Sequence, residues 1–319
     1  MVTGLLLLAR GVHLASGMML VTVLAFRWVV LVPAFSGGGV KEEAWRRFDP
    51  FFARLGRIFV WAGVALVVSG LALFWAVAAG MSGTSLGESL QTDTLGTVLF
   101  QTQFGRVFQL RSVLLVGLAL LAGWSMWRRG FYRRGVDWGE IAAGVVAAAL
   151  TVSFSWTGHA AAHGSVWNLA ADALHLFAAC VWPAGLLPFA LFVSALRKAD
   201  DGAAMECGLK AVRRFSEMSL IVVAVLVLTG IVNSCFLVGS FPALVGSLYG
   251  RILCLKLALL AVILGLAGWN RWRLLPLLAD EAGRLPRLGR LRSFVLAEFS
   301  LAMGIIAVVA VLGTTPPPH

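Results

Sequence analysis

Charged residues are scarce in this chain. Asp, Glu, Lys and Arg make up 13% of its 319 residues, whereas 60% are hydrophobic and the mean hydropathy is +0.89. A soluble domain uses roughly a quarter of its residues as charges to coat its surface. The shortage therefore excludes an ordinary soluble domain and predicts that most of the outer surface meets a lipid bilayer.

Signatures of nucleotide and hydrolytic chemistry are missing as well. The sequence contains no P-loop, dinucleotide fingerprint, HExxH motif or nucleophile elbow, so no catalytic residue is assigned. A CxxC motif is also absent, and the cysteines lack paired spacing, which argues against a disulfide framework. These absences favour a transporter or metal-binding membrane protein over an enzyme. The cysteines are Cys180, Cys207, Cys235 and Cys254.

Eight apolar stretches have about the length that a helix needs to cross a bilayer, roughly 20 residues. No basic region precedes the first stretch, so we expect no cleaved signal peptide and a retained first helix. The sequence thus predicts an all-α, polytopic membrane protein of about eight transmembrane helices. The stretches cover residues 5–32, 58–79, 107–127, 141–157, 167–196, 220–238, 252–269 and 294–312.

The basic residues indicate the orientation of these helices. Most of the 26 Lys and Arg residues lie in the loops that follow the first, third, fifth and seventh stretches. The intervening loops 80–105 and 158–166 contain none. The positive-inside rule places the basic loops in the cytoplasm and both termini on the extracytoplasmic face. Topology therefore explains the net charge of +11, and we expect no nucleic-acid partner.

The two halves of the chain resemble each other. We interpret the likeness as a duplicated four-helix unit with a pseudo-two-fold axis along the bilayer normal. Residues 1–135 hold the first three helices, 136–160 hold the fourth, and 161–319 form the second unit. Chance similarity between apolar helices is the alternative. The matched pairs are Phe104–Arg111 with Tyr249–Lys256, Ala122–Trp124 with Ala267–Trp269, His13-Leu14 with His175-Leu176, and Ser69-Gly70 with Thr229-Gly230.

Histidines gather toward the predicted extracytoplasmic face. His159 and His163 lie four residues apart in a loop, while His13 and His175 lie inside predicted helices. Imidazole is the commonest metal ligand among side chains and suits copper and zinc. Asp172, three residues before His175, is a further candidate, because a carboxylate can orient an imidazole or ligate a metal beside it. The alternative is that the intramembrane histidines only make hydrogen bonds between helices.

Two other groups of side chains are candidates for binding. Thioether and thiolate ligands select Cu(I), although such residues in apolar helices mostly pack. Basic side chains near the outer ends of the third and seventh helices could form an anion or haem-propionate site, or could extend toward the interface. The soft ligands are Met18, Met19, Cys235 and Cys254, and the basic residues are Arg106, Arg111, Arg251 and Lys256.

An ordered set of short motifs in the second half resembles the copper resistance D (CopD) family of bacterial inner-membrane proteins. One departure is Trp182-Pro183-Ala184-Gly185, where the family typically has paired glycines after the tryptophan. The motifs are Gly158-His159-Ala160-Ala161, Asp172, His175-Leu176, Trp182, Gly185-Leu186, Arg214-Phe215-Ser216, Thr229-Gly230, Asn233, Tyr249-Gly250-Arg251, Lys256, Glu298 and Thr315-Pro316-Pro317.

The resemblance implies copper import across, or copper delivery at, a bacterial inner membrane, often beside a separate periplasmic copper-binding protein. In this reading copper meets His159, with His163, and then passes to His175 and His13. A rival from another class is a membrane b-type haem protein in electron transfer, with His13 and His175 as axial ligands. A third reading is a structural or assembly factor whose histidines only pack.

Overall fold

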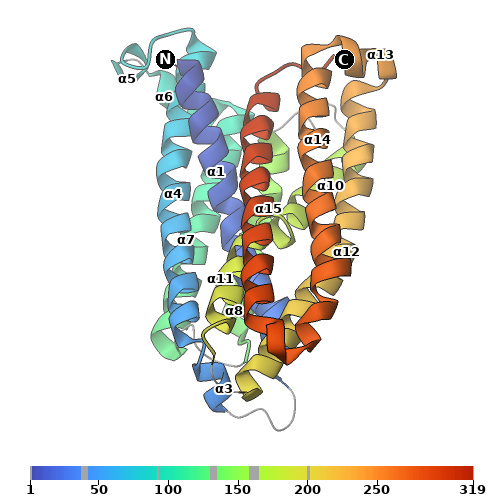
Figure 1. The fold of residues 1–319 in the computed structure, drawn as a ribbon. Helices are drawn as coiled ribbons and strands as arrows, with labels where there is room; N and C mark the ends of the chain where they lie inside the picture. The colour runs from blue at the N-terminus through green and yellow to red at the C-terminus, as the bar shows by residue number, and fades with distance from the viewer. Residues whose placement is uncertain are drawn as a thin grey trace.

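The protein is a bundle of long helices. A computed structural model describes residues 2–36, 42–91, 93–129, 135–157, 165–199 and 202–318. Within these ranges the chain forms helices and turns and contains no strand (Figure 1). Eight of the helices are long and apolar enough to cross a membrane. The prediction of an all-α protein with eight spans is therefore confirmed.

Several of the eight spans are built from more than one helical segment, and four short helices lie in the connections. The spans are α1 (Val2–Ala25) with η1 (Phe26–Leu31) and α2 (Val32–Phe35); α4 (Asp49–Ser82); α7 (Gln103–Arg129); α8 (Trp138–Val152) with η2 (Ser153–Thr157); α10 (Val166–Val181) with α11 (Leu186–Leu196); α12 (Gly202–Val238); α14 (Leu248–Trp269) with η3 (Asn270–Leu274) and η4 (Pro276–Ala279); and η5 (Glu281–Gly283) with α15 (Arg284–Leu312). The connecting helices are α3 (Glu42–Arg46), α5 (Glu88–Gln91), α6 (Thr94–Gln101) and α13 (Phe241–Gly246).

Three helices begin well before the apolar stretches that predicted them. Helix α4 starts at Asp49, α12 at Gly202 and α15 at Arg284, so basic residues assigned to loops, such as Arg54 and Lys210, lie within helices. Hydropathy marks only the part of a helix that crosses lipid, and a helix can continue beyond it. The fifth span differs in another way, because it breaks at Trp182–Gly185 between α10 and α11.

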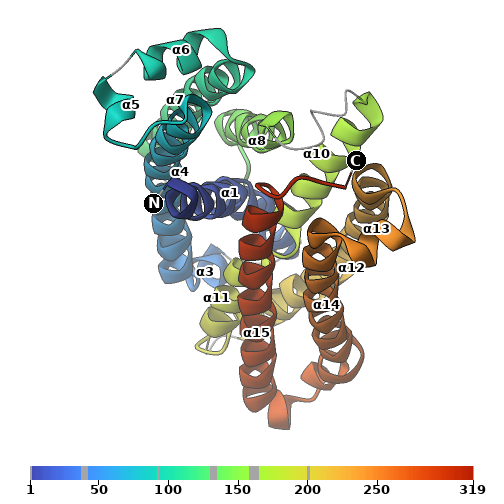
Figure 2. The same cartoon turned by 90° about the horizontal axis from the view of Figure 1, so that it is seen from above.

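Both ends of the chain lie at the same end of the bundle (Figures 1 and 2). Helices α5, α6 and α13 lie at this end, while α3 and the connection from α11 to α12 lie at the opposite end (Figure 1). The basic connections therefore share one end, as the alternation of charge predicts. Which end faces the cytoplasm stays a prediction, as does the division of the chain into two repeated units.

Helix α1 lies at the centre of the bundle. It packs along α4 and also contacts α8, α10 and α15 (Figure 2). Directly after α1, the ring of Phe26 in η1 packs against those of Phe192 and Phe215, which come from α11 and α12. Large apolar side chains such as Trp61 and Ile221 are instead exposed, as expected for lipid-facing positions.

The matched Gly-Arg motifs lie where a short helix meets the start of a long one. Thr102 Oγ1 accepts a hydrogen bond from the Gly105 backbone N–H at 2.9 Å, and Ser247 Oγ accepts one from Gly250 at 3.0 Å. A Cβ atom at either glycine would lie 2.1 Å from a carbonyl oxygen of the preceding α6 or α13. Each glycine therefore permits a close backbone approach that any larger residue would prevent.

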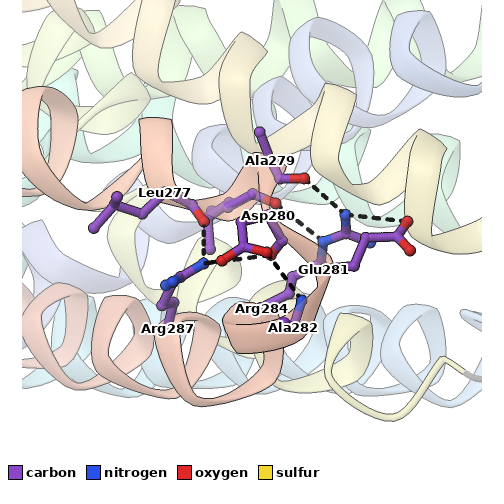
Figure 3. A network of polar contacts seen from close by, with 8 residues as sticks. Leu277, Ala279, Asp280, Glu281, Ala282, Arg284 and Arg287 are labelled. Carbon is purple, nitrogen blue, oxygen red and sulfur yellow. Dashed lines mark hydrogen bonds and ion pairs between the residues drawn. The ribbon is translucent and has the colours of Figure 1, made fainter.

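Arginines hold the turn between the seventh and eighth spans (Figure 3). Arg287 Nη1 donates to Asp280 Oδ2 at 2.8 Å and to the Leu277 carbonyl at 2.7 Å, while Arg284 Nε donates to Leu278 at 3.0 Å. The hydrogen bond from Arg287, followed by one from the Ala282 backbone, lowers the pKa of Asp280 below its ordinary value. The basic residues of this connection thus shape the turn as well as marking its side of the membrane.

Candidate functional site

His13 lies buried between α1, α4 and the η2 segment. Its Nδ1 atom is 3.1 Å from the Leu66 carbonyl oxygen and 3.3 Å from Ser69 Oγ. The ring of Phe154 packs 5.2 Å from the imidazole ring. A Cβ atom at Gly70 would lie only 3.0 Å from His13 Cε1, so this glycine makes room for the ring.

His175 has a similar environment in the second half of the chain. Its Nδ1 atom lies 3.0 Å from the hydroxyl oxygen of Thr229 in α12. A Cβ atom at Gly230 would lie 3.4 Å from His175 Cε1. Each intramembrane imidazole therefore rests against a hydroxyl residue followed by glycine, at the positions that the comparison of the two halves pairs.

The hydrogen bonds assign the proton on each imidazole. The Leu66 carbonyl can only accept, so His13 Nδ1 must donate to it. Thr229 donates its own hydroxyl proton to the Val225 carbonyl at 2.7 Å, so it accepts from His175 Nδ1. Both rings thus carry a proton on Nδ1, and in the neutral form of each ring the lone pair lies on Nε2. A metal-binding histidine in a protein has this arrangement.

Asp172 of α10 lies in a polar group that joins four helices. Asn233 Nδ2 of α12 donates to Asp172 Oδ1 at 3.4 Å. The carboxylate also interacts electrostatically with Lys256 of α14 and with Arg10 of α1. Lys256 interacts electrostatically with His175 as well. The partnership of Asp172 with His175 remains a prediction, and His175 Nδ1 donates its hydrogen bond to Thr229.

The basic residues predicted near the outer ends of α7 and α14 differ in environment. Arg111 is buried, and its guanidinium donates to the Ser153 hydroxyl at 2.9 Å, to the Ser153 carbonyl at 2.8 Å and to Thr157 Oγ1 at 2.8 Å. The guanidinium also lies over the Phe154 ring at 4.7 Å. Lys256 is half-buried, whereas Arg106 and Arg251 are exposed. Arg111 is thus already committed to contacts inside the protein.

Arg10 occupies the position in α1 that corresponds to Asp172 in α10, three residues before the histidine. Its Nη1 atom donates to the Gly313 carbonyl at 2.8 Å, just beyond the end of α15. The two halves therefore differ in the charge of the residue three positions before the histidine. Each imidazole also has a cation that acts on it electrostatically, Arg111 on His13 and Lys256 on His175, and Arg10 acts on Arg111.

The remaining predicted ligands differ in their surroundings. Met18 is buried in the main hydrophobic core and Met19 packs against it. Cys235 is an exposed free thiol and Cys254 a half-buried one. His159 and His163 lie outside the described residues. Within the part of the chain that the structure describes, no group of three or more His, Cys, Asp and Glu side chains is placed to hold a metal ion.

Sequence reasoning overlooked three residues at these sites. Ser69 and Thr229 served only to align the halves, although they contact the imidazoles directly. Asn233 served only as a family motif, although it binds Asp172. The signal that could have found the first two was their pairing, since a hydroxyl and a glycine recur at the same interval in both halves.

Two family models match the chain. One, described as the N-terminal domain of copper resistance protein D-like proteins, matches residues 1–169, and one described as copper resistance protein D matches residues 209–312. The chain is 30% identical to copper resistance protein D of Pseudomonas syringae pv. tomato over 263 residues, which cover 80% of this chain and 81% of that protein. The chain belongs to the copper resistance protein D family.

Two further relatives extend the comparison within this family. The copper transport protein CutJ of Bacillus subtilis is 27% identical over 74% of this chain and 41% of its own length. The inner membrane protein YebZ of Escherichia coli is 27% identical over 80% of this chain and 83% of its own length. No solved structure matches significantly. With its eight apolar helices, this member of the copper resistance protein D family is a multi-pass inner-membrane protein.

Proposed function

We propose that this protein handles copper, taking the ion from the extracytoplasmic side and importing or delivering it through the membrane. The observation that carries the proposal is the matched pair of imidazoles, His13 buried and His175 half-buried, each with a hydrogen-bond partner at Nδ1. Imidazole nitrogen is a good ligand for copper ions. The family membership supports copper as the cargo, because related proteins are described as copper resistance and copper transport proteins.

The two imidazoles have different parts in this proposal. His175, with Asp172 nearby, offers the better site for a cation, because the carboxylate offsets part of its charge. His13 offers a site of lower affinity, since Arg111 repels a cation there and Arg10 stands where the second half has Asp172. Near His175, by contrast, Asp172 offsets the charge of Lys256. A site with few ligands suits a copper ion that must be released again. His159 and His163 remain proposed ligands where copper enters, and a separate periplasmic copper-binding protein is the proposed donor.

Copper binding by the purified protein tests the proposal. We expect copper measured by elemental analysis to fall when His175→Ala is introduced, and to fall less with His13→Ala. Ser219→Ala is a matched control, because this α12 hydroxyl bonds only to the Phe215 carbonyl of its own helix. Copper contents that are the same in all four proteins would refute the assigned ligands.

A visible absorption spectrum of the same samples separates copper from the haem alternative. The copper proposal predicts no Soret band and no stoichiometric iron. A strong Soret band that disappears in His13→Ala or His175→Ala would instead make the two histidines axial ligands of haem b and would overturn the copper assignment.

A further inference from the structure

Glu298 is a buried carboxyl group in the middle of α15. Only 2% of the residue is exposed, and it lies six residues beyond Arg292 in the apolar part of the helix. Asn270 Nδ2 donates a hydrogen bond to Glu298 Oε1 at 2.6 Å. No other partner of this carboxyl group occurs among the described residues. Nothing in the proposed handling of copper uses this side chain.

A glutamate of the first half, Glu140, has a different partner. Glu140, near the start of α8, forms an ion pair with the fully buried Arg27 of η1. Arg27 Nη2 also donates to the Gly135 carbonyl at 2.9 Å. Both glutamates are thus held by a residue of a π-helical segment, η1 or η3. The charge of Glu140 is neutralised by a cation, whereas Glu298 receives only an uncharged amide.

The cations nearest Glu298 in the sequence and in the packed elements are engaged elsewhere. Arg271 of η3 donates to Ser216 at 2.7 Å, Arg292 of α15 donates to Ser194 at 2.7 Å, and Arg273 lies over Trp269 at 5.9 Å. Helix α11, which packs on α15, has no titratable residue. The other titratable groups on elements packed against α15 lie toward either end of the bundle: Arg10 and His13 of α1; Tyr249, Arg251, Cys254 and Lys256 of α14; Glu281 of η5.

A buried carboxylate without a cation is strongly disfavoured, and such a group usually becomes neutral by binding a proton. The amide of Asn270 points to the same conclusion. Its Oδ1 atom is buried and has no hydrogen-bond partner. A protonated Glu298 could donate its O–H to Oδ1 while Oε1 accepts from Nδ2, which closes a ring of two hydrogen bonds and leaves no acceptor unused. A metal ion fits less well, since the pair supplies only two oxygen ligands.

We propose that Glu298 is a proton-binding site, neutral in the resting protein and held by the amide of Asn270. The ligand is a single proton, taken up by one carboxylate oxygen and shared with the amide oxygen. Separation of α15 from η3 would break the ring, hydrate the carboxyl group and release the proton. The protein would then possess a proton site distinct from its histidines, in the half of the membrane nearer the basic connections.

Infrared spectroscopy of the purified full-length protein tests this site without any metal. We expect the C=O stretching band of a protonated carboxylic acid at neutral pH, with a shift on exchange into D₂O. The band should disappear in Glu298→Gln, which keeps the shape of the side chain, and should persist in Glu281→Gln, where the carboxylate is exposed. A band that survives in Glu298→Gln would overturn the proposal.

Two measurements keep the test decisive should Glu298→Gln fold poorly. The absence of a protonated-acid band in the wild-type protein at neutral pH would refute the proposal by itself. In Asn270→Leu the band should shift to higher frequency, because the acid loses its hydrogen-bonding partner, and an unshifted band would also refute the ring. These readouts do not depend on copper, so failure of the copper proposal would leave them unchanged.

Discussion

Thr229 Oγ1 lies 3.0 Å from Nδ1 of His175 while the same hydroxyl donates its proton to the Val225 carbonyl at 2.7 Å. The threonine can therefore only accept from the imidazole, and its position defines which ring nitrogen carries the proton. In the first half, Ser69 also donates to a carbonyl of its own helix, that of Ala65 at 2.6 Å, and lies 3.3 Å from His13 Nδ1. In each half, a hydroxyl that donates to a carbonyl of its own helix thus lies beside Nδ1 of the histidine.

Removing this hydroxyl should weaken metal binding. Thr229→Val keeps the shape of the side chain but leaves His175 Nδ1 without its acceptor, and loss of such a partner lowers metal affinity by about 10–100-fold. Thr229→Ser restores the acceptor and should restore the affinity. Titration of purified protein with copper against a competing chelator measures the change. A Thr229→Val protein that binds copper as tightly as the wild type would contradict the role assigned to this hydroxyl.

Filling the space beside His13 should destabilise the bundle. In Gly70→Ala the new Cβ lies 3.0 Å from His13 Cε1, and overpacking of this kind costs about 1–3 kcal/mol. Gly63 lies in the same helix with nothing within 4 Å of its Cβ position, so Gly63→Ala should be neutral or stabilising. Thermal unfolding in detergent compares the two variants. Equal melting temperatures would show that His13 moves away without cost.

The buried ion pair between Arg27 and Glu140 should be costly to break. Arg27→Met leaves the Glu140 carboxylate without its cation, and the removal of one partner from a buried pair costs about 3–5 kcal/mol. The exposed pair of Arg46 and Glu42, 3.8 Å apart, provides the control, because such pairs contribute only about 0–1 kcal/mol. The Arg46→Met protein should therefore have a free energy of unfolding close to that of the wild type. Similar losses of stability in both variants would argue against burial as the reason why the Arg27–Glu140 pair is costly to break.

Acid should weaken the turn held by Asp280. Its pKa in the folded protein lies below the ordinary value of 3.8, because Arg287 and the Ala282 backbone donate to the charged form. The stabilisation is therefore present above pH 3.8 and is lost as the pH falls through the lower folded-state pKa. Asp280→Asn should lower the melting temperature at neutral pH. The difference in melting temperature between this variant and the wild type should become smaller in acid. Glu43→Gln, at an exposed carboxylate in α3, serves as the control.

Most of the fold could be predicted because membrane helices leave a strong local signal. Apolar length located all eight spans. Apolar length gives no information about segments outside the lipid or about how neighbouring segments pack. The short helices α6 and α13 were missed, since they are far shorter than a helix that crosses the bilayer. The break at Trp182–Gly185 was noted only as a departure from the family's motif, because the sequence does not show how the two segments pack.

The sites were predictable only in part. His13 and His175 stood out because ionisable residues are rare within a membrane. Their partners could not be identified in the same way, since Ser69 and Thr229 lie more than 50 residues away along the chain. Arg27 and Glu140 are 113 residues apart, and nothing local connects them. The lack of a cation beside Glu298 emerges only when these tertiary contacts are compared between the halves.

The hydrogen bond from Arg10 to the Gly313 carbonyl bears on biosynthesis. The two residues are separated by 303 positions, so ribosomes deliver the arginine to the membrane long before its acceptor has been made. Until the last span inserts, the guanidinium has the charge of Asp172 as a partner but no Gly313 carbonyl to bind. The first helix therefore gains its last polar contact only when α15, the final span, has been added.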